Sequence, residues 1–245
     1  MNDQDLLIHG LEIVCENAYE KAVSDKDAFV QLRRQGLGAS DSAIYLGVNP
    51  YSTWEDLVVQ KCSKEVTEEE RAVGEKETVR KGADLEPLIL NKFEAWSGVP
   101  VYKPDAMYRL TQHPQLTVNF DGIISLTDTH LPVEAKYVSP YASKYWNRGK
   151  CLQAIHEGRP YIAAGTSVQE HVTLLAELYG IPAYYFTQVQ HQLLALNAPF
   201  GYLVALFDKG WELGVYKIFA DKFTQQMLLH ESKNIWEIVE ARRNG

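Results

Sequence analysis

The most restrictive feature of this sequence is a stretch without charge: no Asp, Glu, Lys or Arg occurs from Leu178 to Phe207. A stretch of this length is buried either in a protein core or in a membrane. It contains a histidine, an asparagine, two prolines and three glutamines, which are poorly suited to the centre of a bilayer. The stretch therefore predicts a buried helix over 184–197 followed by a strand over 200–207, and we expect no membrane span.

Two strand-turn-strand patterns accompany this stretch. The first joins 122–126 to 131–138 through a turn at 128–130, and the second joins 200–207 to 212–219. Apolar residues at helical spacing lie before, between and after these hairpins. They predict helices over 6–14, 54–62, 85–97, 141–149, 166–179, 184–197 and 221–243. This order of elements predicts an α/β fold in which helices pack on a sheet.

Internal repeats, low-complexity tracts and linker-like segments are absent from the sequence, and its 245 residues are enough to bury a sizeable core. We therefore expect one domain over 1–245. Its parts are a helical region over 1–31, a core over 32–219 and a terminal helix over 220–245.

Composition argues against several classes of protein. The formal charge of -8, from 24 Lys and Arg against 32 Asp and Glu, disfavours a nucleic-acid binder that works by bulk charge. It leaves room for a local basic lining. The three cysteines are far apart and form no Cys-x-x-Cys, which disfavours a disulfide framework, a cysteine zinc site and a four-cysteine iron–sulfur cluster. A reducing cytoplasm is the simplest compartment for such a chain.

The first hairpin carries the residues most suited to chemistry. Asp121 precedes its first strand, and Glu134 lies half-way along the second, so antiparallel pairing would place the two carboxylates side by side. Alternation along the strand points Glu134 and Lys136 to one face. Carboxylate oxygens together with the backbone carbonyl of Ala135 suit Mg²⁺ or Mn²⁺. Lys136 would then orient or deprotonate a water; the alternative is a surface Glu-x-Lys on an exposed strand.

Two further elements supply polar groups. Glu86 falls inside the apolar arc of the 85–97 helix, where a carboxylate needs a partner. Because Pro87 follows it, Glu86 is equally well explained as the cap of a helix beginning at Pro87. Gln188 lies on a polar face of the 184–197 helix, where its amide can hold water or phosphate or is simply a surface polar group.

Basic residues gather locally despite the acidic total. Five bases and one acid occur from Lys136 to Pro160, interleaved with tyrosines and a tryptophan. Arg33 precedes a glycine-containing turn that leads to Ser40, and an arginine beside a helix start suits a phosphate. These features indicate DNA contact, or else a solvated basic face.

Five short motifs, in this order, resemble the lambda-type alkaline exonucleases, also called YqaJ-like viral recombinases, of the PD-(D/E)xK nuclease superfamily. They are LRRQGLGASDSAIYLGVNPY (32–51), GADLEP (82–87), NFDG (119–122), VEAK (133–136) and IPAYYFTQVQHQLLAL (181–196). The resemblance implies a mixed central β-sheet flanked by α-helices around a restriction-endonuclease-like core. It also implies Mg²⁺-dependent 5′→3′ digestion of one strand of duplex DNA, with two ions per site that Mn²⁺ can replace.

The same resemblance implies a ring-shaped homotrimer that threads DNA ends. It implies a single-strand annealing protein as partner, and a phage or mobile-element origin in a bacterial host. Carried over residue by residue, Asp121, Glu134, Ala135 and Glu86 are metal ligands, Lys136 is the motif lysine and Gln188 lies near the attacking water. Arg33, Ser40 and Asn119 match the positions that hold the 5′-phosphate.

The sequence departs from the family pattern at three points. Phe120 replaces the usual proline before the aspartate, and Asn119 replaces a phosphate-binding serine of the lambda enzyme. The 51 residues between Lys136 and Gln188 exceed the family's compact spacing, with the excess around 156–178. Two other functions remain open: a PD-(D/E)xK endonuclease of restriction or repair type, and a DNA-end-binding module on an inactive nuclease fold.

Overall fold

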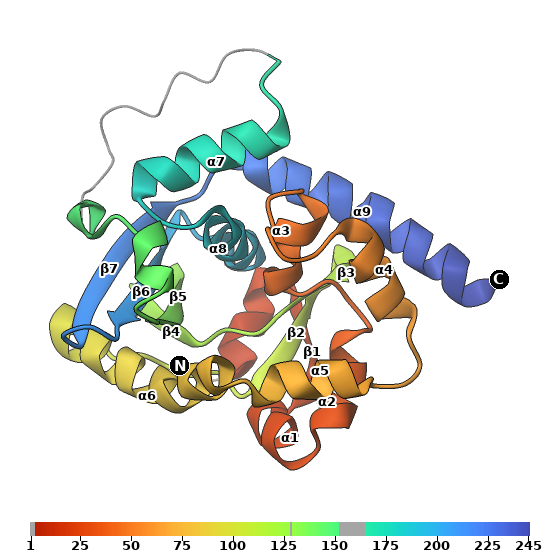
Figure 1. The fold of residues 1–245 in the computed structure, drawn as a ribbon, viewed down its shortest axis with the longest axis horizontal. Helices are drawn as coiled ribbons and strands as arrows, with labels where there is room; N and C mark the ends of the chain where they lie inside the picture. The colour runs from red at the N-terminus through yellow and green to blue at the C-terminus, as the bar shows by residue number, and fades with distance from the viewer. Residues whose placement is uncertain (1–2, 128, 152–164) are drawn as a thin grey trace.

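The computed structural model describes residues 3–127, 129–151 and 165–245 (Figure 1). Its larger sheet has the order β4 (Gly122–Leu126), β5 (Thr129–Val138), β6 (Phe200–Phe207) and β7 (Glu212–Phe219). The two hairpins are antiparallel, and β5 pairs with β6 in parallel. The sheet is therefore mixed, as expected. The first turn is tighter than predicted, because Thr129 already pairs with Leu126 at the start of β5; residue 128 lies outside the described residues.

A second, three-stranded sheet was not anticipated. It has the order β1 (Leu11–Glu16), β2 (Ala106–Leu110) and β3 (His113–Val118), all antiparallel. The predicted helix over 6–14 is wrong: a 3-10 helix (Asp3–His9) ends there and β1 begins at Leu11. The strand forms because its backbone pairs with β2, a contact between segments remote in the chain that periodicity does not report.

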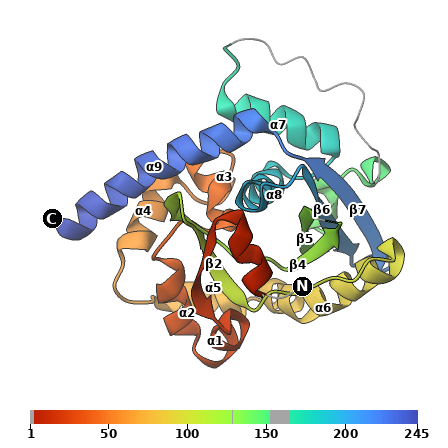
Figure 2. The same cartoon turned by 180° about the vertical axis from the view of Figure 1, so that it is seen from behind.

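Helices cover and separate the two sheets. In Figures 1 and 2, α8 (Ala183–Leu196) lies between them, and it contacts β3 on one side and β5 and β6 on the other. α6 (Glu77–Ser97) packs on β5 and β6, while α7 (Val168–Tyr179) and α9 (Lys222–Asn244) pack on α8. α8 belongs to the stretch without charge, and its burial between the two sheets explains why that stretch carries no charged residue.

The remaining helices are short and lie toward the N-terminus. They are α1 (Ala18–Ser24), α2 (Lys26–Arg33), α3 (Ser42–Tyr45), α4 (Trp54–Cys62) and α5 (Glu68–Glu75). The helix predicted over 141–149 is wrong: only two 3-10 turns form, at Ala142–Tyr145 and Arg148–Lys150. Of the excess segment around 156–178, residues 156–164 lie outside the described residues and 168–178 form most of α7.

One hydrophobic cluster joins the larger sheet, the second sheet and the helices between them. Fully buried residues of α8, including Phe186, Val189 and Leu193, form its centre. On α9, Leu228, Ile235 and Val239 are buried, whereas Phe223 is exposed. No helix in the described part of the chain is long and apolar enough to cross a membrane.

Candidate functional site

A cavity of about 260 Å³ is lined by residues of both sheets and by Gln188 of α8. Eight of the nine residues singled out from the sequence line it. They are Arg33, Ser40, Glu86, Asn119, Asp121, Glu134, Lys136 and Gln188. The ninth, Ala135, is adjacent through its backbone. The structure thus brings to one place residues that lie up to 155 positions apart.

The register of the first hairpin places the two carboxylates together. Gly122 pairs with Val133, so Asp121, just before β4, lies opposite Glu134. The N–H of Ala135 donates to Asp121 Oδ2 at 2.9 Å. Because the N–H and C=O of one strand residue point to the same edge, the Ala135 carbonyl faces the Asp121 side as well. The predicted pairing of Asp121 and Glu134 is therefore present in the fold.

Glu134 is held on both carboxylate oxygens. Its side chain is 1% exposed, and Oε1 accepts hydrogen bonds from the Lys136 ammonium and from Gln188 Nε2, the latter at 2.5 Å. Gln192 Nε2 donates to the other oxygen, Oε2, at 2.5 Å. Residues four apart on a helix share a face, so Gln188 and Gln192 reach the same carboxylate. Gln192 was not singled out from the sequence, although its spacing from Gln188 was a usable signal.

Negative charge is in excess at this point. Burial, and then the charge of Asp121, raise the pKa of Glu134 to about 7. The same two causes raise the pKa of Glu86, although Lys103 opposes them. Burial lowers the pKa of Lys136, but Glu134 and Asp121 outweigh it and hold that pKa above its ordinary value. Lys136 is therefore an ammonium here, which favours its orienting role over a role as base.

Glu86 reaches the cavity from the interior of a helix. α6 begins at Glu77, so Glu86 is no cap for a helix starting at Pro87, and that alternative is wrong. Its carboxylate pairs with Lys103 Nζ at 2.8 Å. Lys103 also lines the cavity and was not singled out from the sequence. It lies in the connection before β2, where nothing in its neighbours marks it.

The donor set fits a hard divalent cation. Asp121, Glu134, Glu86 and the Ala135 carbonyl supply oxygen atoms, which Mg²⁺ and Mn²⁺ prefer. Burial, and then repulsion by Asp121, raise the carboxyl pKa values of Glu134 and Glu86, and a bound cation would favour their charged forms. Within the ranges that the structure describes, no three Asp, Glu, His or Cys side chains already converge as a ligand cluster. Glu86 is turned to Lys103, and Glu134 to Lys136 and the two amides.

Cationic, hydroxyl and amide side chains line the same cavity as the carboxylates. Arg33 Nη2 donates to Ser40 Oγ at 2.9 Å, and Asn119 Nδ2 lies 3.4 Å from the Ala106 carbonyl oxygen. The loop that carries Ser40 is tied to β3, because Leu37 exchanges backbone hydrogen bonds with Gln115 and Thr117. Arg33, Ser40 and Asn119 are thus placed together, as an anion site requires.

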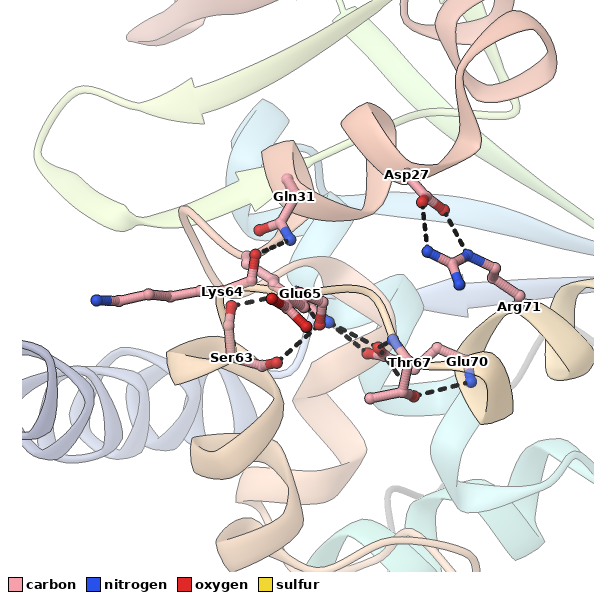
Figure 3. Close-up of polar contacts among 9 residues, drawn as sticks. Asp27, Gln31, Ser63, Lys64, Glu65, Thr67, Glu70 and Arg71 are labelled. Atoms are coloured by element: carbon pink, nitrogen blue, oxygen red, sulfur yellow. Dashed lines mark hydrogen bonds and ion pairs between the residues drawn. The ribbon is translucent and has the colours of Figure 1, made fainter.

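The helix that carries Arg33 is anchored from outside the cavity (Figure 3). Arg71 forms a two-point ion pair with Asp27 on α2, with a shortest distance of 2.7 Å. Gln31 Nε2 donates to the Lys64 carbonyl at 2.7 Å. Arg34, next to Arg33, is buried and pairs with Glu70 at 2.7 Å. α5 and the connection that precedes it therefore hold both ends of α2.

Comparisons with known proteins identify the family to which this part of the chain is similar. A family model described as the YqaJ-like viral recombinase domain matches residues 28–197. Uncharacterized protein YqaJ of Bacillus subtilis (strain 168) is 29% identical over 121 residues, which are 49% of this chain and 36% of that protein. The match thus covers little more than a third of the length of this curated relative (36%).

Solved structures of an alkaline exonuclease from Laribacter hongkongensis share the fold. The enzyme alone aligns with a TM-score of 0.55 and 16% identity, over 86% of this chain and 91% of the enzyme. Its complex with dAMP gives the same score and identity, over 88% and 93%. The likeness confirms the predicted fold class, a PD-(D/E)xK-like arrangement of sheets flanked by helices.

Proposed function

This chain belongs to the YqaJ-like viral recombinase domain family, and we propose that it is a Mg²⁺-dependent exonuclease that digests one strand of duplex DNA from its 5′ end. One observation carries the proposal: a single cavity is lined both by the carboxylates of Asp121, Glu134 and Glu86 and by the hydrogen-bonded Arg33–Ser40 pair. Cleavage at the end of a strand needs both a hydrolytic centre and a binding site for the terminal phosphate. The likeness to alkaline exonucleases supports the same class of reaction.

In this proposal Asp121, Glu134, Glu86 and the Ala135 carbonyl would hold the metal. When bound, the metal would polarise the scissile phosphate and acidify a water. The Lys136 ammonium and the Gln188 amide, both on Glu134 Oε1, orient that water and the phosphate oxygens. Arg33, Ser40 and Asn119 bind the terminal 5′-phosphate, so the length of the cavity sets how far from the end the strand is cut.

The wider setting is part of the same proposal and follows the family resemblance. The remaining 3′ single strand is the substrate for a single-strand annealing protein. The chain assembles as a homotrimeric ring around duplex DNA, in the cytoplasm of a bacterial host. In a ring, three copies of the basic segment from Lys136 to Lys150 would offset the overall negative charge toward the DNA.

A digestion of three substrates tests the proposed function. Linear duplex with a 5′-phosphate should release nucleotides in Mg²⁺, and should release none when the metal is chelated. Covalently closed circular duplex should stay intact, because it has no end. Nicking of the circle would replace the exonuclease with the endonuclease alternative. Binding of ends without any release, under all metal conditions, would favour the inactive end-binding module.

A further inference from the structure

A group of tyrosines lies at the surface beside the N-terminal end of α8. Tyr51, Tyr145 and Tyr184 line a second cavity, of about 400 Å³, that shares no lining residue with the first. Tyr51 is 79% exposed and Tyr145 is 52% exposed. Rings left in water add little to the stability of the fold, so a cluster of them marks a binding surface. We call this cavity, with its rim residue Tyr141, the tyrosine groove.

The tyrosine groove is linked to the candidate active site by a series of side-chain contacts. Tyr184 lies one helical turn before Gln188, so both are on the same face of α8. Its ring centroid is 4.4 Å from that of Tyr185 and 6.1 Å from that of Tyr51. Lys136 Nζ in turn lies 5.6 Å from the centre of the Tyr185 ring. An unbroken series of aromatic rings therefore leads from the cavity that holds Glu134 to the exposed Tyr51.

Positive charge borders the same groove. Lys144 Nζ lies 4.1 Å from the ring centre of Tyr141 and 4.9 Å from that of Tyr145. Lys150 packs beside Gly180, next to the start of α8. Glu177 is the acidic group in the lining. Exposed aromatic rings interleaved with cations are the surface that single-stranded nucleic acid binds, because bases stack on the rings and phosphates contact the cations.

We propose that the tyrosine groove binds single-stranded DNA by stacking bases on Tyr51, Tyr145 and Tyr184. Duplex DNA does not satisfy this surface, since its base faces are already stacked against one another. The groove adjoins the hydrolytic cavity, so it holds the unpaired nucleotides at the junction where the duplex is opened. The source of those nucleotides rests on the proposed function; the stacking itself does not.

Binding measured without cleavage tests the groove. The Glu134→Gln protein in chelator is titrated with a fluorescent deoxythymidine strand of about 20 nucleotides, long enough to span several stacking sites. Tyr51→Ala and Tyr145→Ala should each raise the Kd about tenfold, the usual loss when one stacking ring is removed. Tyr51→Phe and Tyr145→Phe should bind like the parent. The control Trp96→Ala removes a half-exposed ring on α6 outside the groove and should leave the Kd unchanged.

A second measurement uses the unaltered tyrosines. Strands with 5-bromodeoxyuridine are cross-linked by light to the same Glu134→Gln protein, and adducts on Tyr51, Tyr145 or Tyr184 are expected. Duplexes with a 5′ tail or a 3′ tail then report which strand occupies the groove. Cross-links only at other residues, or a Kd that rises equally with Trp96→Ala, would overturn the proposal.

The outcomes separate this inference from the proposed function. If the wild type digests linear duplex but neither alanine variant changes strand binding, the groove proposal is wrong and the exonuclease proposal stands. If strand binding depends on the tyrosines but the wild type digests no DNA, the groove proposal stands and the exonuclease proposal is wrong.

Discussion

This molecule contains two buried carboxylate–lysine pairs, and the comparison between them separates a structural role from a chemical one. Lys61 Nζ pairs with Asp41 Oδ2 at 2.7 Å beneath the loop that carries Ser40. Lys136 pairs with Glu134 on β5. Burial raises the pKa of both carboxyls, but the net result is opposite: the pKa of Asp41 is lowered, and that of Glu134 is raised to about 7.

The neighbours of each pair explain the difference. Lys61 and Arg33 both face Asp41, and the Gly38 N–H donates to it, so positive groups outweigh the cost of burial. Glu134 instead faces a second carboxylate, Asp121, with one ammonium between them. In the Asp41–Lys61 pair the charges are balanced, and the pair holds the loop that carries Ser40 in place. The Glu134–Lys136 pair leaves negative charge unbalanced at a cavity, which is what a site for a cation requires.

The largest effect should come from removing the unbalanced charge. Glu134→Gln keeps the size of the side chain but removes its charge, so we expect DNA digestion to fall by at least about 10³-fold, as when a principal transition-state group is lost. The variant should remain folded, because neither Gln188 nor Gln192 loses a partner of similar shape. A linear-duplex digestion assay and circular dichroism measure the two outcomes. Appreciable digestion by this variant would remove Glu134 from the chemistry.

Removal of the lysine should cost more stability at the Asp41 pair than at the Glu134 pair. Lys61→Met strands a buried carboxylate and the Arg33 carbonyl that Lys61 also contacts, so the free energy of unfolding should fall by about 3–5 kcal/mol. Lys136→Met should cost less stability, because Lys136 lines the cavity and water can replace its ammonium. Urea unfolding of both variants compares the losses. A larger loss for Lys136→Met would mean that its pair is the structural one.

Added Mg²⁺ should stabilise the protein through the second pair alone. At about 100 times its Kd, a ligand that binds only the folded state stabilises by about 2.7 kcal/mol, which raises the Tm by several degrees for a chain of this size. Glu134→Gln and Asp121→Asn should lose the shift. Asp41→Asn should keep it, since Asp41 lies outside the donor set. An equal shift in all three variants would place the cation elsewhere.

Without metal, the two carboxyls should give opposite slopes of stability against pH. Glu134 has a raised pKa, so its contribution is present below about pH 4.5 and is lost as the pH rises toward 7. Asp41 has a lowered pKa, so its contribution is present above its ordinary pKa of about 3.9 and is lost at lower pH. One proton gives a slope of at most about 1.4 kcal/mol per pH unit.

Urea titrations of wild type, Glu134→Gln and Asp41→Asn isolate each slope by difference. The Glu134→Gln protein should show a smaller decline than wild type between about pH 4.5 and 7, because Glu86, whose pKa is also raised, still contributes. The Asp41→Asn protein should show a smaller decline below about pH 4, because other carboxyls with lowered pKa values, such as that of Asp221, still contribute. Matching pH profiles for wild type and Glu134→Gln would contradict the raised pKa.

The smallest effect concerns the residue that the two regions share. Arg33 supports the low pKa of Asp41 and also pairs with Ser40 in the cavity. Arg33→Ala should reduce the preference for 5′-phosphorylated over hydroxyl ends by about tenfold, roughly 1.4 kcal/mol, which is near the lower end of the range for one hydrogen bond to a charged group. Parallel digestion of both substrates gives the ratio. An unchanged ratio would separate Arg33 from the phosphate.

Several parts of the candidate site followed from local sequence. The spacing from Asp121 to Glu134 implies one strand, a tight turn and half a strand, and the register observed places them opposite each other. Alternation along β5 and helical spacing along α8 likewise depend on neighbours in the chain, so they could be predicted. Gln192 was overlooked, although it shares the face of Gln188.

Other parts depended on contacts between segments far apart in the chain. The sequence by itself determined the hairpin that carries Asp121 and Glu134, the uncharged α8 and the family motifs, because each rests on spacing along a few turns or strands. Only the tertiary structure decided that Leu11 begins a strand, that Lys103 pairs with Glu86 and that Asp121 raises the pKa of Glu134. Those outcomes are set by backbone pairing, burial and charge between distant segments, which spacing along the chain does not encode.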